Sequence, residues 1–197
     1  MANAASSSTI SKFKSTLIGG GARPNLFEVV MNTPSGITFP SNDFTILCKS
    51  AALPASNIAS IDVPFRGRIF KVAGDRTYDT WTVTVINDEN FAIRTAMESW
   101  MQRIGQYGDG AGATTPTSYM VNATVNQLKR GATNAPNTTG SVHQIAKSYN
   151  FYDIFPTNIS AIDLSYDSTD QIEEFTVEFQ VQYWAPSTVT NPATWWF

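Results

Sequence analysis

The sequence predicts a mainly β protein, folded as an antiparallel β-barrel or sandwich with one flanking α-helix. Three observations support this class. Apolar and polar side chains alternate over residues 81–86 and again over residues 175–183, which places the apolar ones on one face of a strand. Between these segments, apolar residues within 93–104 recur at steps of three and four, the period of a helix. We therefore expect a core built from strands and covered by a single helix.

The chain divides into one domain and two extensions. Its 197 residues are enough for one well-buried core. The N-terminal segment is rich in Ala, Ser and Thr and ends in three glycines, a composition that cannot bury enough apolar surface to order itself. The closing Trp195, Trp196 and Phe197 are expected to pack on this subunit or on a neighbour. We expect a flexible arm over 1–21 with a helical stretch near 10–18, a barrel domain over 22–184 and an extension over 185–197.

Turn chemistry separates the first two expected strands of the domain. Residues 26–30 form the first strand, and the Pro and Gly of residues 33–36 end it. A second strand is expected over residues 44–49, where most side chains are apolar. These two segments supply the first walls of the predicted core.

A long, irregular segment follows and then the clearest strand of the chain. Residues 58–72 alternate imperfectly, and Pro64 and Gly67 indicate an edge strand or the arm of a long hairpin. A polar turn after Val72 is expected to lead into the strand at Trp81. The threonines on the second face of that strand favour extended backbone and can face water or another subunit.

The predicted helix begins after this strand. Asn87 or Asp88 can cap its N-terminus, where negative charge also suits the helix dipole, and Gly105 ends it. The apolar stripe is expected to pack on the core rather than to bind a ligand. It consists of Ile93, Met97, Trp100 or Met101, and Ile104.

The rest of the domain is expected to alternate between loops and strands. The segments, in order, are a loop over 105–118, a strand over 119–129, a loop over 130–141, a strand over 142–152, a turn at 155–158 and a strand over 159–167. The final strand alternates from Phe175 to Tyr183, a length of roughly 33 Å. Such a length exceeds that of common strands and suits a barrel wall.

The composition indicates a surface with few charges. Charged residues make up 15% of the chain, against about 25% in typical soluble domains. Such a surface is tolerated when copies of the same chain cover it, although an ordinary neutral β domain is the alternative. The net charge of −3 and the absence of a basic run argue against sequence-independent binding of nucleic acid.

The sequence supplies few reactive groups, so we expect no enzymatic activity, cofactor or metal. His143 is the only histidine and Cys48 the only cysteine, which excludes the usual ligand sets of zinc sites. Along one strand face Glu174 and Glu178 lie about 13 Å apart, too far for the carboxylate pair of a glycosidase. The carboxylates Asp163, Asp167 and Asp170 could hold calcium around a turn, but a solvated turn is the favoured interpretation.

The chain also lacks signals for export or membrane insertion. The segment before residue 22 has no apolar run of signal-peptide length, and no stretch is apolar enough to span a membrane. A single cysteine suits a reducing compartment. We therefore expect no membrane anchor.

Five segments together carry a resemblance to a known family. They are 22–27, 48–54, 72–89, 155–158 and 175–184. The run over 74–81, Gly-Asp-Arg-Thr-Tyr-Asp-Thr-Trp, is fairly specific, and the remaining segments are individually weak but occur in the right order. From about residue 22 to 184, the chain resembles the tail tube proteins of contractile-tailed (myovirus-type) bacteriophages.

The resemblance implies a structural virion protein. Its strands would complete a hexameric ring barrel, and stacked rings would form the inner tail tube, the conduit for DNA ejection inside a contractile sheath. Such tubes are related to the tube of the type VI secretion system. The implied partners are other copies of the chain, the tail sheath protein, the baseplate, the tail terminator and the tape measure protein, with genomic DNA passing without specific binding. The implied location is the tail tube of the virion, assembled in the host cytoplasm.

Two groups of surface residues are candidates for this role. The arm over 53–70 is expected to contact a stacked ring, with a simple intramolecular hairpin as the alternative. Carboxylates are expected to face the lumen, since a lumen with the sign of DNA repels phosphate; they are Asp79, Glu174 and Glu178. The interface candidates, with their arginines as ion-pair donors, are Leu53, Pro54, Ile58, Pro64, Phe65, Arg66, Arg68 and Arg76.

Other functions remain open at this point. A monomeric β-barrel could bind a small apolar ligand in a cavity lined by Trp81, Phe175 and Phe179. A hydrolase would need His143 beside a nucleophile. Within the favoured class, the tube could belong to a secretion machine or to a phage-like particle without a genome.

Overall fold

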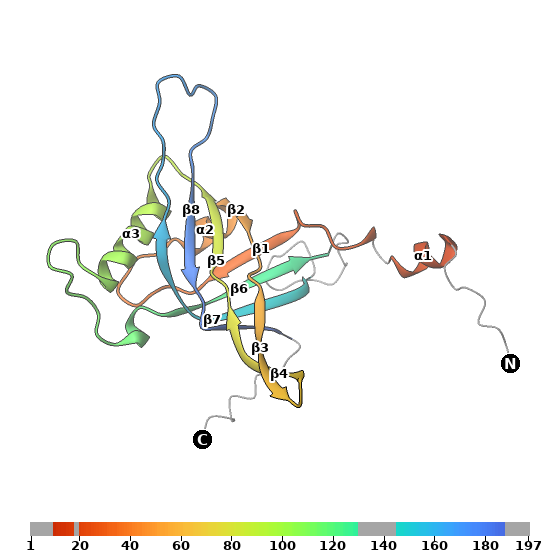
Figure 1. Cartoon of the computed structure of the whole chain (residues 1–197). Coiled ribbons are helices and arrows are strands. Elements are labelled where there is room, and N and C mark those ends of the chain that lie inside the picture. The colour runs from red at the N-terminus through yellow and green to blue at the C-terminus, as the bar shows by residue number, and fades with distance from the viewer. Residues whose placement is uncertain (1–9, 18–19, 130–144, 188–197) are drawn as a thin grey trace.

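The computed structural model describes residues 10–17, 20–129 and 145–187 (Figure 1). The fold is mainly β, as predicted, and its strands pair antiparallel. The elements are α1 (Ile10–Thr16), β1 (Phe27–Met31), α2 (Ser41–Leu47), β2 (Cys48–Ala51), β3 (Ser56–Phe65), β4 (Arg68–Tyr78), β5 (Trp81–Ile86), α3 (Ala92–Ile104), a 3₁₀ turn (Pro116–Ser118), β6 (Val121–Leu128), β7 (Ile145–Ile159), β8 (Glu174–Gln180) and β9 (Tyr183–Pro186).

The strands form two sheets of very different size. A seven-stranded sheet has the order β1-β6-β7-β8-β5-β2, with β9 also paired to β7, and a two-stranded sheet consists of β3 and β4. The large sheet curls around the core, while the small one extends away from it (Figure 1). The small sheet is therefore an arm attached to a packed body.

Strand β7 joins the two halves of the large sheet. Its first part pairs with β6 and β9, and its last part pairs with β8. Asp153 has a left-handed φ of 53°, and the register to β6 shifts beside it, between Phe151 and Ile154. Such a bulge bends a strand and increases its twist. The bend lets one strand serve both halves of the sheet.

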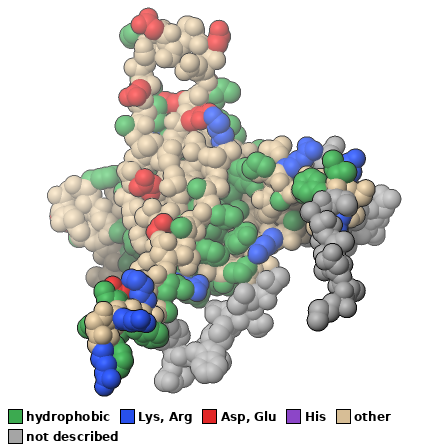
Figure 2. Space-filling view, turned by 45° about the vertical axis from the view of Figure 1, so that its right-hand side comes forward, with side chains coloured by type: hydrophobic (Ala, Val, Ile, Leu, Met, Phe, Trp, Pro, Cys, Tyr) green, Lys and Arg blue, Asp and Glu red, His purple; other side chains and the backbone are tan. Residues whose placement is uncertain are grey.

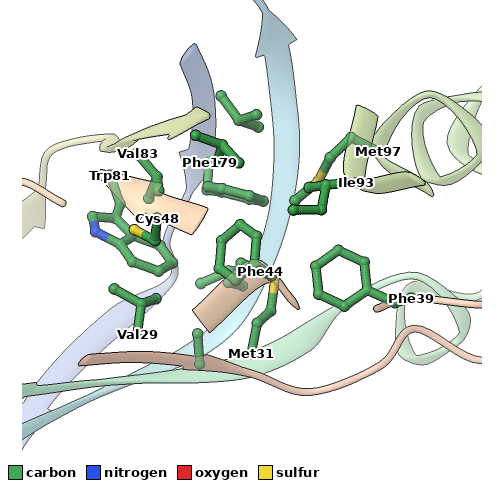
Figure 3. Packing of buried hydrophobic residues seen from close by; sticks show 14 of the residues in the cluster. Val29, Met31, Phe39, Phe44, Cys48, Trp81, Val83, Ile93, Met97 and Phe179 are labelled. Atoms are coloured by element: carbon green, nitrogen blue, oxygen red, sulfur yellow. The ribbon is translucent and has the colours of Figure 1, made fainter. Parts of the chain in front are cut away.

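Aromatic rings fill the centre of the core, and side chains from strands and helices converge there (Figure 3). Trp81 stacks on Phe151 with ring centroids 4.6 Å apart. Phe179 contacts both Trp81 and Trp100 at centroid distances of 5.4 and 5.9 Å. All four rings are fully buried, and burial of a large apolar side chain contributes roughly 1.5–3 kcal/mol.

The predicted helix is confirmed as α3, which packs on the large sheet. Its buried residues are Ile93, Ala96, Met97 and Trp100, so Trp100 rather than Met101 faces the core. The N-cap residue is Phe91, in a left-handed conformation with φ of 53°, and not the predicted Asn87 or Asp88. Asp88 nevertheless accepts the first N–H of the helix, because the Ala92 N–H donates to its Oδ1 at 3.0 Å. The Trp100 indole N–H donates to the Tyr119 carbonyl oxygen at 2.7 Å and joins α3 to the chain entering β6.

The strand predicted over 44–49 is wrong, because α2 occupies most of it and β2 begins only at Cys48. The helix places Phe44 in the core against Phe39, with ring centroids 5.4 Å apart. Thr45 Oγ1 donates to the carbonyl oxygens of Ser41 and Val29, which ties the helix to β1. Tertiary contacts thus determine the secondary structure of this segment, which is too short for its apolar spacing to distinguish a helix from a strand.

The polar turn predicted before Trp81 is also wrong, since β4 continues through Tyr78. Strand β3 supplies hydrogen-bonding partners along this length and overrides the turn-forming residues. A register shift lies between the pairs formed by Ile58 and Ser60. The extra residue of that bulge belongs to β4, beside Gly74, where the backbone approaches Ala59 closely.

Two predictions in the second half of the domain need correction. Residues 155–158 are not a turn, because β7 runs through Pro156 with a register shift before Asn158; a proline is accommodated at such a bulge. Consequently no strand is assigned over 160–167. The last strand is shorter than predicted, because β8 ends at Gln180 and β9 then pairs with β7.

Further predictions of local structure are either confirmed by the structure or lie outside the residues that it describes. The helical stretch near the N-terminus is confirmed by α1, the strand over 119–129 by β6, and the loop over 105–118 apart from its 3₁₀ turn. The predicted loop over 130–141, His143 and the terminal aromatic residues lie outside the described residues.

Candidate assembly surface

The arm predicted from Pro64 and Gly67 is a hairpin of β3 and β4. Arg66 and Gly67 form its two-residue turn with φ of 46° and 81°, the conformation that matches the twist of a tight hairpin. At the base of the arm, the Asp79 N–H donates to the Ala55 carbonyl oxygen at 3.1 Å. The arm is thus well formed and held at its root, yet projects from the body (Figure 1).

One face of the arm is apolar and exposed. Side chains of a strand alternate between faces, and the register pairs Ile61 with Val72 and Val63 with Phe70. These four and Phe65 therefore share one face. Their exposed fractions run from 42% for Val72 to 67% for Phe70, and Figure 2 shows apolar side chains along the projecting arm. A contiguous exposed apolar surface on a folded domain marks an interaction site.

The opposite face of the arm is more polar. It carries the ion pair between Lys71 Nζ and Asp62 Oδ1 at 2.8 Å, together with the exposed Ile69 opposite Pro64. The difference between the faces gives the arm a preferred side for contact. An arm that packed on its own body would bury one of these faces, but every residue from Asn57 to Ala73 is exposed in the described structure.

The predicted interface residues occupy different parts of this arm. Pro64, Phe65, Arg66 and Arg68 lie at its tip, and Arg66 places its guanidinium over the Phe65 ring at 5.4 Å. Nearer the base, Ile58 pairs with Arg76, and Leu53 is exposed in the connection that precedes the arm. Pro54, by contrast, is buried within the chain and does not contribute to the exposed surface.

Sequence reasoning predicted Phe65 but missed the other four residues of this apolar face. The spacing of Ile61, Val63 and Phe65 at steps of two was the signal for one apolar strand face. Phe70 and Val72 repeat it on β4, and Ile69 lies on the other face. Pro64 and Gly67 interrupt the alternation of apolar and polar residues, so the apolar face is not evident from the sequence. The hairpin register identifies it.

The predicted lumen carboxylates do not cluster. Glu174 and Glu178 lie on β8 opposite Ile86 and Thr82 of β5, at separate positions along the sheet face that points away from the core. Both carboxylate oxygens of Glu174 accept hydrogen bonds from Lys49 Nζ, so its charge is locally compensated. Asp79 lies beyond the end of β4 and accepts a hydrogen bond from Asn57 Nδ2 at 3.0 Å.

The predicted apolar ligand cavity is not present around its proposed residues. Trp81, Phe175 and Phe179 are at most 1% exposed, and their rings pack on other core side chains or on Arg94, whose guanidinium lies 5.4 Å from the Phe175 ring. An open groove of about 680 Å³ lies elsewhere, between α3 and the residues near Ile37. Its lining is largely polar and does not suit an apolar ligand.

Reactive chemistry is sparse in the described part of the chain. Cys48 is buried, and this burial raises the pKa of its thiol to about 12, which keeps it protonated and weakly nucleophilic. Within residues 10–17, 20–129 and 145–187, no three His, Cys, Asp or Glu side chains are grouped to hold a metal ion. The helices described are also too short or too polar to cross a bilayer.

Comparison with known proteins places these features in a family. The model of the family described as phage tail tube protein matches residues 22–187. The chain is 35% identical over 166 residues to the tail tube protein gp19 of Enterobacteria phage T4, a match that covers 84% of this chain and 92% of that protein. It is 22% identical over 176 residues to the tail tube protein of Serratia phage KSP90, covering 87% and 93% of the two chains.

Solved structures show the same fold at low sequence identity. A chain of the anti-feeding prophage baseplate superposes with a TM-score of 0.61 at 13% identity and covers 84% of this chain and 94% of its own. A chain of an extracellular contractile injection system, from its sheath–tube complex, gives a TM-score of 0.60 at 15% identity and covers 93% and 100%. The fold, the family match and the identity to phage tail tube proteins agree, and the chain belongs to the phage tail tube protein family.

Proposed function

We propose that this protein is the structural subunit of the inner tube of a contractile phage tail. Copies form rings of six, the rings stack into a tube within the sheath, and the genome passes through its lumen. The observation that carries this proposal is the exposed apolar face of the β3–β4 arm, five large side chains that no described residue of the chain covers. Family membership supplies the identity of the partner, which is another copy.

Ring closure has a physical basis in the large sheet. The hydrogen-bonded order ends at β1 on one side and at β2 on the other, and β9 pairs with β7 alone. Each of these three strands therefore carries an edge of backbone donors and acceptors. Edge strands pair readily with another chain, and a head-to-tail contact closes into a ring when its rotation permits. Neighbouring copies in a ring therefore satisfy one another's edges. The baseplate structure that shares this fold is itself six-fold symmetrised.

The lumen is assigned to the polar face of β5 and β8. Thr82 and Thr84 lie there beside Thr176 and Glu178, and these side chains are half-buried. Neutral hydroxyls and a carboxylate offer no cation to phosphate, so DNA is not held during transit. Asp79 and Glu174 add negative charge nearer the rims, although Lys49 compensates part of it.

The remaining partners follow from where related tubes are found. Chains with this fold occur in structures of a baseplate, a sheath–tube complex, a tube-terminating cap and a sheath/tube terminator. By extension we assign the tail sheath protein, the baseplate and the terminator as partners of this tube, with the tape measure protein inside it. The protein acts in the virion tail after assembly in the host cytoplasm, and its role involves no enzymatic step.

A tube from a secretion machine or a genome-free particle is the second candidate. The same fold occurs in an anti-feeding prophage and in an extracellular contractile injection system, so the fold does not separate the two functions. The 35% identity to the phage T4 tail tube protein favours the phage tail.

Electron microscopy of the purified chain tests the proposal. We expect rings in dilute solution at raised salt and tubes when protein concentration rises or salt falls. Compact monomers across all concentrations and salts would contradict it. Packaged DNA in tailed particles from the native source would then select the phage tail over the genome-free particle.

A further inference from the structure

Opposite charges gather at the two ends of the molecule. The connection between β7 and β8, residues 160–173, carries Asp163, Asp167 and Asp170, while the turn of the β3–β4 arm carries Arg66 and Arg68. Figure 1 places the 160–173 loop and the arm at opposite ends of the protein. Figure 2 shows acidic side chains at the loop end and basic ones at the arm end.

Neither group of charges has an ionic partner within the described residues. The ion pairs found there join Lys49 to Glu174, Lys71 to Asp62 and Arg94 to Glu98. The three loop aspartates and the two arm arginines are exposed, and each group could accept a counter-charge from outside. Because the groups lie at opposite ends, they cannot pair within one copy.

Exposed apolar side chains accompany the charges at both ends. In the loop, Leu164 is 85% exposed, and Tyr166 and Ile172 are also largely exposed. At the arm tip, Phe65 and Ile69 are similarly uncovered. A contact that excludes water around an ion pair strengthens it relative to an isolated surface pair. The two ends thus match in charge and in apolar content.

The base of the loop is fixed to the body, which gives the acidic end a defined position. The Ser160 N–H donates to the Thr176 carbonyl oxygen at 2.8 Å, and the Thr176 N–H donates to Ser160 Oγ at 2.9 Å. Arg94 Nη1 also donates to the Ser160 carbonyl oxygen at 3.3 Å. The hydrogen bonds at the root of the arm do the same for the basic end.

We propose that the arginine-tipped arm of one copy docks on the acidic 160–173 loop of a copy stacked against it. The occupant of each surface is the other surface on an identical chain, chosen by charge complementarity. Contacts between different patches of the same molecule propagate rather than close when no rotation brings them together. This inference rests on the proposed function and adds the surface that accepts the arm arginines. The contact between the arm and the 160–173 loop would then set the direction in which rings stack along the tube.

The chemistry suits a contact that forms reversibly and in one orientation. Arg guanidinium groups bind carboxylates through two parallel N–H···O bonds. Like charges would meet if a copy were inverted, and such juxtaposition disfavours the wrong orientation. Because the charges lie near the surface, stacking should weaken as salt rises.

Charge reversal and its compensation test this contact. One variant carries Arg66→Glu and Arg68→Glu, a second carries Asp163→Lys and Asp167→Lys, and a third carries all four changes. Rings are followed by native mass spectrometry and tubes by electron microscopy and sedimentation. The matched control for added positive charge is Asp43→Lys with Glu89→Lys, both exposed acids without an ion pair in the described residues.

Each reversed variant should keep its rings and raise the protein concentration needed for tubes by about tenfold or more. The third variant, with both signs exchanged, should recover tube formation, and the control should behave as the unaltered chain. Tubes that persist in either reversed variant, or a third variant that makes rings but no tubes, would overturn the inference while the proposed function stands. An unaltered chain that forms neither rings nor tubes defeats the proposed function itself.

Discussion

The pairs β5–β8 and β3–β4 share a backbone arrangement and differ in their surroundings. Both are antiparallel, and both place a row of apolar side chains on one face. The row in β5–β8 includes Trp81 and Phe179, fully buried under α3 and β7, whereas the row in β3–β4 leaves Phe70 67% exposed. The first row stabilises the subunit. The second is available to a neighbouring copy. Mutations in the buried row should therefore lower the stability of the subunit, whereas mutations in the exposed row should impair assembly and leave the stability of the subunit almost unchanged.

The largest effect on the stability of the subunit should come from the buried row. Trp81→Ala removes a ring that stacks on Phe151 and contacts Phe179, and should lower the free energy of unfolding by about 3–5 kcal/mol. Chemical denaturation of dispersed subunits measures this change. Phe65→Ala on the arm is the matched control and should change it by less than about 0.5 kcal/mol. An equal decrease in the free energy of unfolding of the two variants would contradict the claim that only the row in β5–β8 stabilises the subunit.

The second effect is a pH dependence of stability that comes from the buried thiol of Cys48. This residue lies on β2, which pairs with β5. Burial raises the pKa of its thiol from 9.0 to about 12. Since the unfolded chain ionises first as pH rises, the contribution of this thiol is complete below pH 9.0 and is lost between 9.0 and about 12. The slope there is about 1.4 kcal/mol per pH unit.

The measurement compares the unfolding free energy of the unaltered chain with that of Cys48→Ala at pH 8 and pH 10. Other groups titrate equally in both proteins, so the difference between them isolates the thiol. The advantage of the unaltered chain should shrink on going to pH 10. An advantage that stays constant would mean that the thiol is accessible to water.

A smaller effect should come from the segment after β5, where the Asp88 carboxylate accepts the first N–H of α3. Asp88→Ala leaves the Ala92 N–H without its acceptor and should cost about 1 kcal/mol. Asp88→Asn keeps an acceptor oxygen and should lose much less. Thermal denaturation followed by circular dichroism compares the two. If both lose stability equally, the charge near the helix N-terminus, not the hydrogen bond, is what matters.

The smallest effect on the isolated subunit should come from the apolar face of the arm. Val63→Asp together with Phe70→Asp changes exposed side chains that are cross-strand partners. The thermal midpoint of dispersed subunits should therefore hardly change. A large decrease would show that this face packs on its own subunit instead of on a neighbour.

The same contrast explains how far the sequence leads. Strict alternation identified β5 and the core face of β8, and the three-and-four spacing identified α3, because in these elements one periodic face is buried in the subunit. Neither period resolves the seven residues of α2, whose form depends on Phe44 reaching Phe39. The passage of β7 through Pro156 depends likewise on pairing with β8, a long-range contact.

The location of the candidate surface could be predicted from the sequence, but the set of residues that share its apolar face could not. Pro64 and Gly67 located the arm, and the arginines at its tip were visible in the sequence. The sharing of one face by Val63 and Phe70 depends on the hairpin register. The acidic loop was seen only as a solvated turn, because its relation to the arm is a matter of position in three dimensions.

The central claim is that the exposed face of the β3–β4 arm holds copies of this chain together. Electron microscopy of the Val63→Asp/Phe70→Asp variant tests it most directly, with Tyr107→Asp, an exposed aromatic residue in the 105–118 loop, as the control. The account predicts folded subunits that form no tubes for the arm variant and normal tubes for the control. Normal tubes from the folded arm variant would contradict it.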